Sequence, residues 1–182
     1  MDRKEFLKTA CGLGMCGCAL NLFGATTPLL AAEPPAEDQR LAYTRHQLAK
    51  LLGFMAADAP AETCAGILEQ TGRECAKLGQ LGVKFKGDPE GYMATANKAW
   101  GTDFQWNKEK GIIAVSVPEG ECGCPMVDNK RTPAFFCNCS VGYQKESFEA
   151  VFGRPVQASL KESKLGGSKR CVFEVTVSPS AN

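Results

Sequence analysis

The sequence predicts an α+β domain in which N-terminal helices pack on an antiparallel sheet. Between residues 38 and 100 the apolar residues recur every three or four positions, as in amphipathic helices. From residue 104 onwards they alternate with polar residues, as in half-buried strands. Residues 41–178 suffice for one such domain with its own core, and no internal repeat is evident in them.

Three helices are expected ahead of the sheet. The first covers residues 38–55, where the apolar side chains follow a helical period. The second begins near Asp58 and runs to about Leu78, because Pro60 is tolerated in a first turn. The third begins at Asp88. Its inner face is expected to carry Met93, Ala96 and Trp100.

A hairpin is expected after these helices. Phe104 and Trp106 share one face of its first strand, residues 107–111 form the turn, and residues 113–117 alternate in the returning strand. This hairpin leads the chain directly into a cysteine-rich stretch.

A further helix and two strands complete the predicted domain. Ser140 is a natural N-cap, and the helix that it starts is expected to stop at Gly153. Residues 156–160 then alternate, Gly166 and Gly167 make a turn, and the last strand faces inward at every second residue from Cys171.

Residues 1–32 are predicted to be an export signal, and residues 33–40 a linker to the domain. A charged start, MDRKEFLK, precedes a short apolar run, small residues and a polar stretch. RKEFLK resembles the twin-arginine export motif, with Lys4 in place of the second arginine. We therefore expect a periplasmic or otherwise exported protein, cut after Ala32 and without a transmembrane anchor in its mature form. Lipidation at Cys16 or Cys18 is the alternative.

The composition argues against several classes of function. The net charge is +1 and the charges are not gathered in blocks, so no nucleic-acid partner is expected. The sequence has no glycine-rich phosphate loop and no G-x-S-x-G motif, and His46 is its only histidine. Most Cys/His and Ser/His catalytic pairs are thereby removed, and we assign no catalytic residue.

The most informative stretch is PEGECGCPMVDNKRTPAFFCNCSVGY, which carries two Cys-x-Cys pairs, Cys122 with Cys124 and Cys137 with Cys139. In an extended segment, residues i and i+2 face the same way, about 6.5 Å apart. Two such pairs joined by a loop can present four thiolates, as a zinc or iron–sulfur site requires. The helix expected from Ser140 would place its positive end beside the second pair and favour thiolate over thiol.

Two other states of these cysteines remain open, disulfides such as Cys122 with Cys139, or reduced and buried thiols. Seven cysteines follow the predicted signal, so they cannot all pair within the chain. Cys64 and Cys75 lie about 16 Å apart along one predicted helix and cannot share a metal. Cys75 is the more plausible of the two to reach the site, and Cys171 is either a fifth sulfur or a core residue.

The C-terminal part of the chain resembles a known superfamily. CNCSVGY, followed by PVQASLKESKLGGSKRCVFEV, is similar to the 4-vinyl reductase domains. It is closer still to the bacterial proteins labelled L-2-amino-thiazoline-4-carboxylic acid hydrolase-like, which the segment TGRECA also resembles. The resemblance implies an α+β ligand-binding module, in some members of which cysteines hold a zinc near the pocket.

The resemblance carries over to only part of a zinc site. Cys137 and Cys171 fall at ligand cysteines of the pattern, whereas Ser163 stands in the place of a third and Leu160 in the place of an acidic ligand. The missing ligands are expected to come from Cys122, Cys124 and Cys139.

Taken together, these observations predict an exported, cysteine-rich module with a structural zinc that shapes a pocket or a partner surface. The expected ligand is a small apolar or aromatic molecule. Its binding residues are predicted to be Phe104, Trp106, Phe135 and Tyr143. The alternatives are an enzyme, either a hydrolase of a thiazoline-like substrate or an iron–sulfur redox protein, and a disulfide-bridged periplasmic binding protein.

Overall fold

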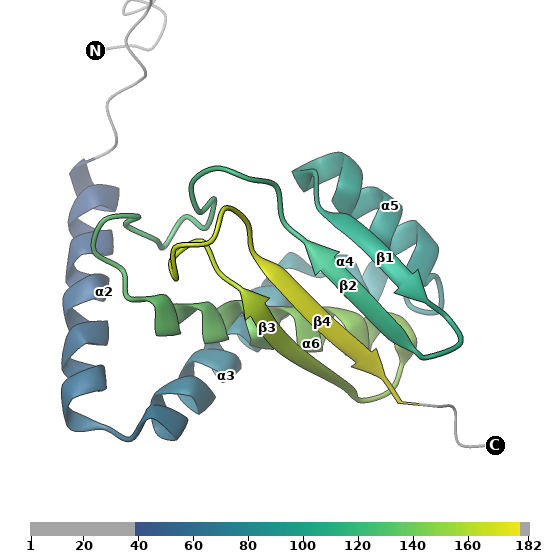
Figure 1. Ribbon diagram of the computed structural model, residues 1–182, viewed down its shortest axis with the longest axis horizontal. Helices are drawn as coiled ribbons and strands as arrows, with labels where there is room; N and C mark the ends of the chain where they lie inside the picture. Colours follow the sequence, from purple (N-terminus) through teal and green to yellow (C-terminus); the bar gives the residue numbers. More distant parts are fainter. Residues whose placement is uncertain (1–38, 179–182) are drawn as a thin grey trace, which may run out of the picture. The chain divides into compact units, whose positions relative to one another are not determined.

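The helical and alternating stretches of the sequence fold into helices on one face of a four-stranded antiparallel sheet, so the α+β prediction is confirmed (Figure 1). The computed structural model describes residues 39–178. The export signal predicted for residues 1–32, and the predicted linker up to residue 38, lie outside the described residues.

The order of elements follows the two parts of the sequence. The helices are α2 (Gln39–Asp58), α3 (Ala61–Gly79), α4 (Leu81–Lys84), α5 (Pro89–Trp100) and α6 (Asn138–Phe152), with a 3₁₀ helix, η1 (Ala134–Cys137), directly before α6. The strands are β1 (Asp103–Asn107), β2 (Ile112–Ser116), β3 (Val156–Glu162) and β4 (Val172–Val177). They lie in the order β1-β2-β4-β3, and all neighbours are antiparallel.

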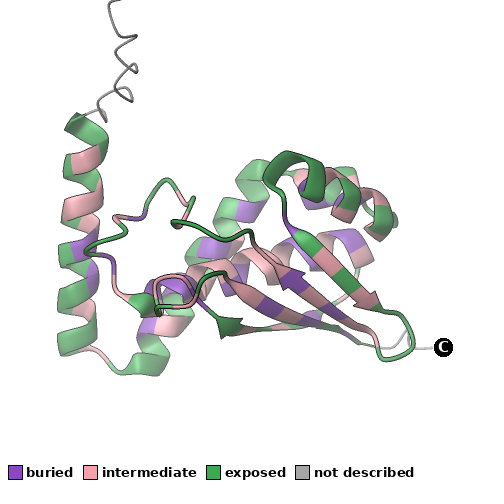
Figure 2. Cartoon of the chain, turned by 45° about the horizontal axis from the view of Figure 1, so that its top comes forward, coloured by how far each residue is buried: buried purple, intermediate pink, exposed green. Residues whose placement is uncertain are grey.

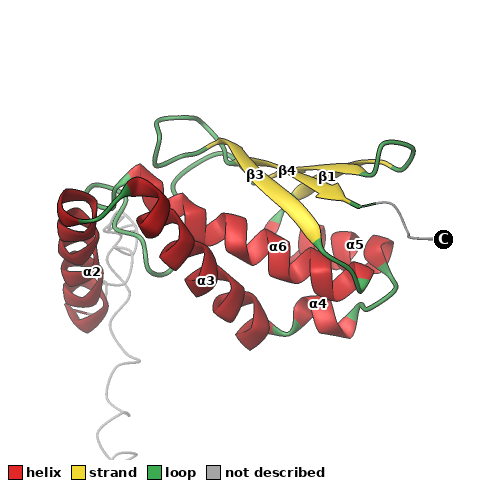
Figure 3. Ribbon diagram, turned by 90° about the horizontal axis from the view of Figure 1, so that it is seen from below, coloured by secondary structure: helices red, strands yellow, loops and turns green. Residues whose placement is uncertain are grey.

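The sheet is covered by helices on one side (Figure 3). There α6 packs against β3 and β4, α5 against β1, and α3 packs on α6 rather than on the sheet. The predicted hairpin forms with Phe104 opposite Val115 and Trp106 opposite Ile113.

Helix ends follow local chemistry. The Asp88 carboxylate accepts a hydrogen bond of 2.9 Å from the backbone N–H of Gly91, which makes Asp88 the N-cap of α5, as expected. Gly101 and Gly153 end α5 and α6 with φ of 67° and 65°, a left-handed conformation that glycine adopts without strain.

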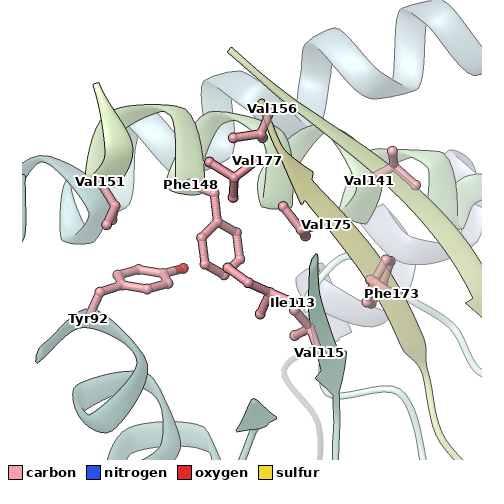
Figure 4. Packing of buried hydrophobic residues seen from close by; sticks show 10 residues of the cluster. All are labelled: Tyr92, Ile113, Val115, Val141, Phe148, Val151, Val156, Phe173, Val175 and Val177. Atoms are coloured by element: carbon pink, nitrogen blue, oxygen red, sulfur yellow. The ribbon is translucent and has the colours of Figure 1, made fainter. Parts of the chain in front are cut away.

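The main core lies between α6, α5 and the sheet (Figure 4). Phe148 is at its centre with an exposed fraction of 0%, and the Tyr92 ring meets it edge-on at 5.3 Å. The prediction for Trp100 is wrong, because this residue occupies the last turn of α5 and is 53% exposed. Tyr92 and Ala96 form the buried face of that helix instead.

A second, smaller core lies beside the first. It joins α2, α3, the loop of residues 117–133 and η1 through Leu52, Leu68, Val127 and Phe136. Most of α2 is exposed, and only Ala49 and Leu52 in it are buried (Figure 2). The cysteine-rich stretch packs around this second core.

Candidate functional site

The first Cys-x-Cys pair is held by an ordered loop, residues 117–133. The Asn129 side chain spans the loop, since its Oδ1 accepts from the backbone N–H of Cys122 at 2.9 Å. The backbone N–H of Val127 donates to the carbonyl oxygen of Cys124 at 3.0 Å. Arg45 of α2 donates from Nε to the carbonyl oxygen of Pro125 at 2.7 Å, which fixes the loop beside that helix (Figure 1). Cys122 and Cys124 are both half-buried against the second core.

The second pair does not lie in an extended segment, which is the geometry assumed from the sequence. Cys137 ends η1, Cys139 lies in the first turn of α6, and Ser140 is inside the helix rather than its N-cap. In an α-helix, the side chains of residues i and i+2 point about 200° apart around the axis. These two thiols therefore cannot aim at one point as they would in an extended segment. The argument from extended geometry is therefore wrong for this pair.

Cys137 faces the β3–β4 connection. Its Sγ lies 3.1 Å from the hydroxyl oxygen of Ser163, and both residues are buried. Cys171 lies in the same region, where its Sγ accepts from the backbone N–H of Lys164 at 3.4 Å. The two cysteines that the resemblance singles out are thus close together, with Ser163 beside them.

Cys139 faces a different set of groups. It is half-buried against the second core, together with Cys122, Cys124 and Phe135. Burial raises the pKa of the Cys139 thiol to about 11, and the negative charges of Cys124, Cys75 and Cys137 contribute to that rise. The thiol of Cys139 is therefore protonated at neutral pH while no cation is near.

Cys124 is central to the cluster. Burial raises the pKa of its thiol most, the backbone N–H of Met126 lowers it, and the charges of Cys122 and Cys75 raise it further. Burial also raises the pKa of Cys137, against the hydrogen bond from Ser163, and the charges of Cys171, Cys122 and Cys124 add to it. The pKa values of Cys137 and Cys139 are thus raised, chiefly by burial, whereas a helix start was expected to favour their thiolates.

The two cysteines of α3 differ in their surroundings. Cys64 is buried, and its thiol donates to the carbonyl oxygen of Met55 at 3.3 Å. Cys75 is exposed, and its charge acts on Cys124 and Cys139. Of the two cysteines of this helix, Cys75 is thus the one whose charge acts on the other thiols.

The donor groups for a soft metal are gathered, but they are not arranged around one point. The seven cysteines among residues 39–178 are all free thiols. Within the same residues, no three His, Cys, Asp or Glu side chains converge closely enough to hold a metal ion as they stand. Thiol donors suit zinc, copper(I) or iron–sulfur chemistry. Because the thiols do not yet converge, side chains would have to rotate toward each other to hold such a metal.

The four predicted ligand-binding residues do not share one pocket. Phe104 and Trp106 pack against the main core, where their rings lie 6.3 Å from Phe148 and 5.7 Å from Phe152, respectively. Phe135 packs against the second core instead. Tyr143 is partly buried, and this burial raises the pKa of its hydroxyl; the charge of Cys75 raises it further.

An open hollow of about 480 Å³ lies next to the first Cys-x-Cys pair. Its lining includes Cys122, Asn129 and Lys164, and none of the four predicted ligand-binding residues. Lys164 also joins two loops there, because its Nζ donates to the carbonyl oxygen of Glu121 at 3.1 Å. Sequence reasoning missed this hollow, since the residues that line it come from two loops far apart in the chain.

No helix in the described part of the chain has the length and apolar character that a membrane span needs.

Comparisons with known proteins show what the chain is similar to. No curated protein matches the chain. Among solved structures it is similar to a trafficking protein particle complex subunit 3 from Naegleria fowleri covalently bound to palmitic acid, with 15% identity over 76% of this chain and 97% of that chain and a TM-score of 0.46. Residues 95–181 match a family of unknown function, DUF6144.

Proposed function

We propose that the protein is an exported metal-binding module in which cysteine thiolates hold one zinc ion beside the second core. The observation that carries this proposal is that Cys122, Cys124 and Cys139 pack half-buried against the same core. In agreement with that placement, the charge of Cys122 raises the pKa of Cys124, and the charge of Cys124 raises the pKa of Cys139. Four or more thiols in one half-buried cluster are the donor set of a structural zinc site.

Zinc would relieve the electrostatic cost of gathering these thiols. Burial and like charge both disfavour thiolates here, as the raised pKa values of Cys124, Cys137 and Cys139 express. A divalent cation reverses that balance, because it binds the thiolate form and displaces the protons. The free energy of binding would then add to the stability of the folded state.

Cys122, Cys124 and Cys139 supply three of the four ligands in this proposal, since all three pack on the same core. The fourth thiol comes from another cysteine of the cluster. A four-thiolate site leaves no position for a reactive water, so the metal would be structural. It would fix the loop of residues 117–133 to α6 and so shape the adjacent surface for a small apolar ligand or a protein partner.

Elemental analysis of the exported protein, purified without added metal, tests the proposal. We expect close to one zinc per chain, lost together with stability when Cys122 and Cys124 are both changed to serine. Cys64→Ser is the matched control, because Cys64 is a buried thiol whose hydrogen bond goes to the backbone of Met55 and not to another cysteine. If the analysis finds iron and inorganic sulfide, the zinc proposal is wrong and the protein carries an iron–sulfur cluster. A metal-free protein with oxidised thiols would overturn both metal assignments.

A further inference from the structure

Helices α3 and α6 approach each other closely at two glycines. A Cβ atom on Gly72 would overlap the carbonyl oxygen of Cys139, and a Cβ atom on Gly142 would overlap the carbonyl oxygen of Glu69. Such backbone-to-backbone contact is possible only because both positions lack a side chain. The crossing therefore brings residues that flank these glycines on one helix next to the backbone of the other.

Cys75 is one of those flanking residues. It follows Gly72 by three positions, and residues three apart are neighbours on a helix surface. Gly72 faces the backbone of both Cys139 and Tyr143, so Cys75 is carried to the same stretch of α6. The charge of Cys75 raises the pKa of Cys124, Cys139 and Tyr143, in agreement with this placement.

Cys137 is turned toward other groups. Its thiol is hydrogen-bonded with Ser163, next to Cys171, at the sheet side of α6. Because Cys137 and Cys139 are two positions apart at a helix start, their side chains leave the helix in different directions. Cys137 would have to give up a buried hydrogen bond to join Cys139, whereas Cys75 is exposed.

We propose that Cys75 is the fourth metal ligand, so that the site spans the crossing of α3 and α6. The ligand set is then Cys75, Cys122, Cys124 and Cys139. This inference rests on the proposed function, and it changes what the metal does. The ion ties three segments together, α3, the loop of residues 117–133 and α6, and one of its ligands is open to solvent.

Metal titration of the full mature chain separates this inference from the proposed function. The probes are Co²⁺, whose thiolate charge-transfer absorption grows with the number of Co–S bonds, and Zn²⁺ in competition with a chromophoric chelator. For Cys75→Ser we expect the charge-transfer intensity to fall by about a quarter, as one of four thiolates is lost. Zinc affinity should fall by about 100-fold or more. Loss of a residue that only supports a metal ligand lowers metal affinity by about 10- to 100-fold, so a larger fall indicates a direct ligand.

Two matched variants complete the test. Cys64→Ser lies in the same helix outside the cluster, and Cys137→Ser removes the thiol bonded to Ser163; both should leave the Co²⁺ spectrum and the zinc affinity unchanged. Circular dichroism of the metal-free variants checks that each one folds. Loss of binding with Cys137→Ser but not with Cys75→Ser would overturn this inference and leave the proposed function standing. A wild-type chain that binds neither metal would overturn both.

Discussion

The backbone of Gly72 in α3 lies directly against the carbonyl oxygen of Cys139 in α6. This contact sets the distance between the two helices and so the positions of the thiols on either side of it. A side chain at this position has no room, because its nearest neighbours would be backbone atoms that cannot rotate away. Packing of α3 on α6 and assembly of the cysteine cluster therefore depend on the same residue.

Substitution of this glycine should be destabilising. We expect Gly72→Ala to lower the free energy of unfolding by about 1–3 kcal/mol, because overpacking outweighs the better helix propensity of alanine. Gly66→Ala in the same helix is the control, since a Cβ there meets nothing within 4 Å, and it should stabilise by up to about 1 kcal/mol. Urea unfolding of both variants measures the difference. Equal effects of the two substitutions would contradict the close approach.

Much of the fold could be predicted because its signals are local. The change from helical to alternating spacing located the hairpin, the acidic side chain of Asp88 located the start of α5, and Gly153 located the end of α6. The burial of Tyr92 in place of Trp100 could not be predicted in this way. Both residues lie near one face of the helix, and only the position of the sheet decides which one is covered.

The site was less predictable, because it depends on one conformational choice and one tertiary contact. The chain enters α6 through η1, so the second Cys-x-Cys pair is helical; Pro133, whose fixed φ suits the start of a helical turn, was the available signal. The role proposed for Cys75 depends on the contacts of Gly72 with Cys139 and of Gly142 with Glu69 across the two helices. No spacing rule within one segment contains that contact.

The ion pairs between α3 and α6 give a second prediction. Arg73 binds the Glu149 carboxylate with both terminal nitrogens, at 2.6 and 3.2 Å, and also reaches Glu146 at 3.0 Å. We expect Arg73→Gln to destabilise the protein by roughly 1–2 kcal/mol at neutral pH, because these are charge-assisted hydrogen bonds at a partly buried site. Arg73→Lys should recover part of the loss, since it keeps the charge without the forked geometry.

The effect of Arg73→Gln should depend on pH. Hydrogen bonding to Arg73 holds the pKa of Glu149 below its ordinary value in the folded protein. A lowered folded-state pKa contributes stability above the unfolded-state value, which is about 4.3, and that contribution is lost as the pH falls through the folded-state pKa. The difference between wild type and variant should therefore shrink on acidification. A difference that stays constant from neutral to strongly acidic pH would refute the assignment.

The N-cap of α5 gives a third prediction. The Asp88 carboxylate accepts from the backbone N–H of Gly91 at 2.9 Å. Loss of such a cap costs about 1 kcal/mol, so Asp88→Ala should lower the thermal unfolding temperature, whereas Asp88→Asn, which can also cap, should change it little. If both variants lose the same stability, the charge at the helix end rather than the cap is the cause.

The buried tyrosine of the main core gives a fourth prediction, for alkaline pH. Burial raises the pKa of Tyr92 to about 12, and its exposed fraction is only 2%. Because the unfolded-state pKa is about 10, the stability linked to this hydroxyl is complete below pH 10 and is lost as the pH rises toward 12. The difference between these two pKa values corresponds to roughly 2–3 kcal/mol of unfolding free energy for a group this deeply buried.

Tyr92→Phe isolates this contribution, because phenylalanine cannot ionise. We expect the free energy of unfolding of the wild type to fall faster than that of Tyr92→Phe between pH 9 and pH 11, as measured by urea titration at each pH. Tyr43→Phe is the control, since Tyr43 is 65% exposed and its variant should follow the wild-type curve. Parallel curves for the wild type and Tyr92→Phe would mean that the hydroxyl ionises as freely in the folded protein as in the unfolded chain. The packing of Tyr92 against Phe148 would then be looser than the 5.3 Å edge-on contact requires.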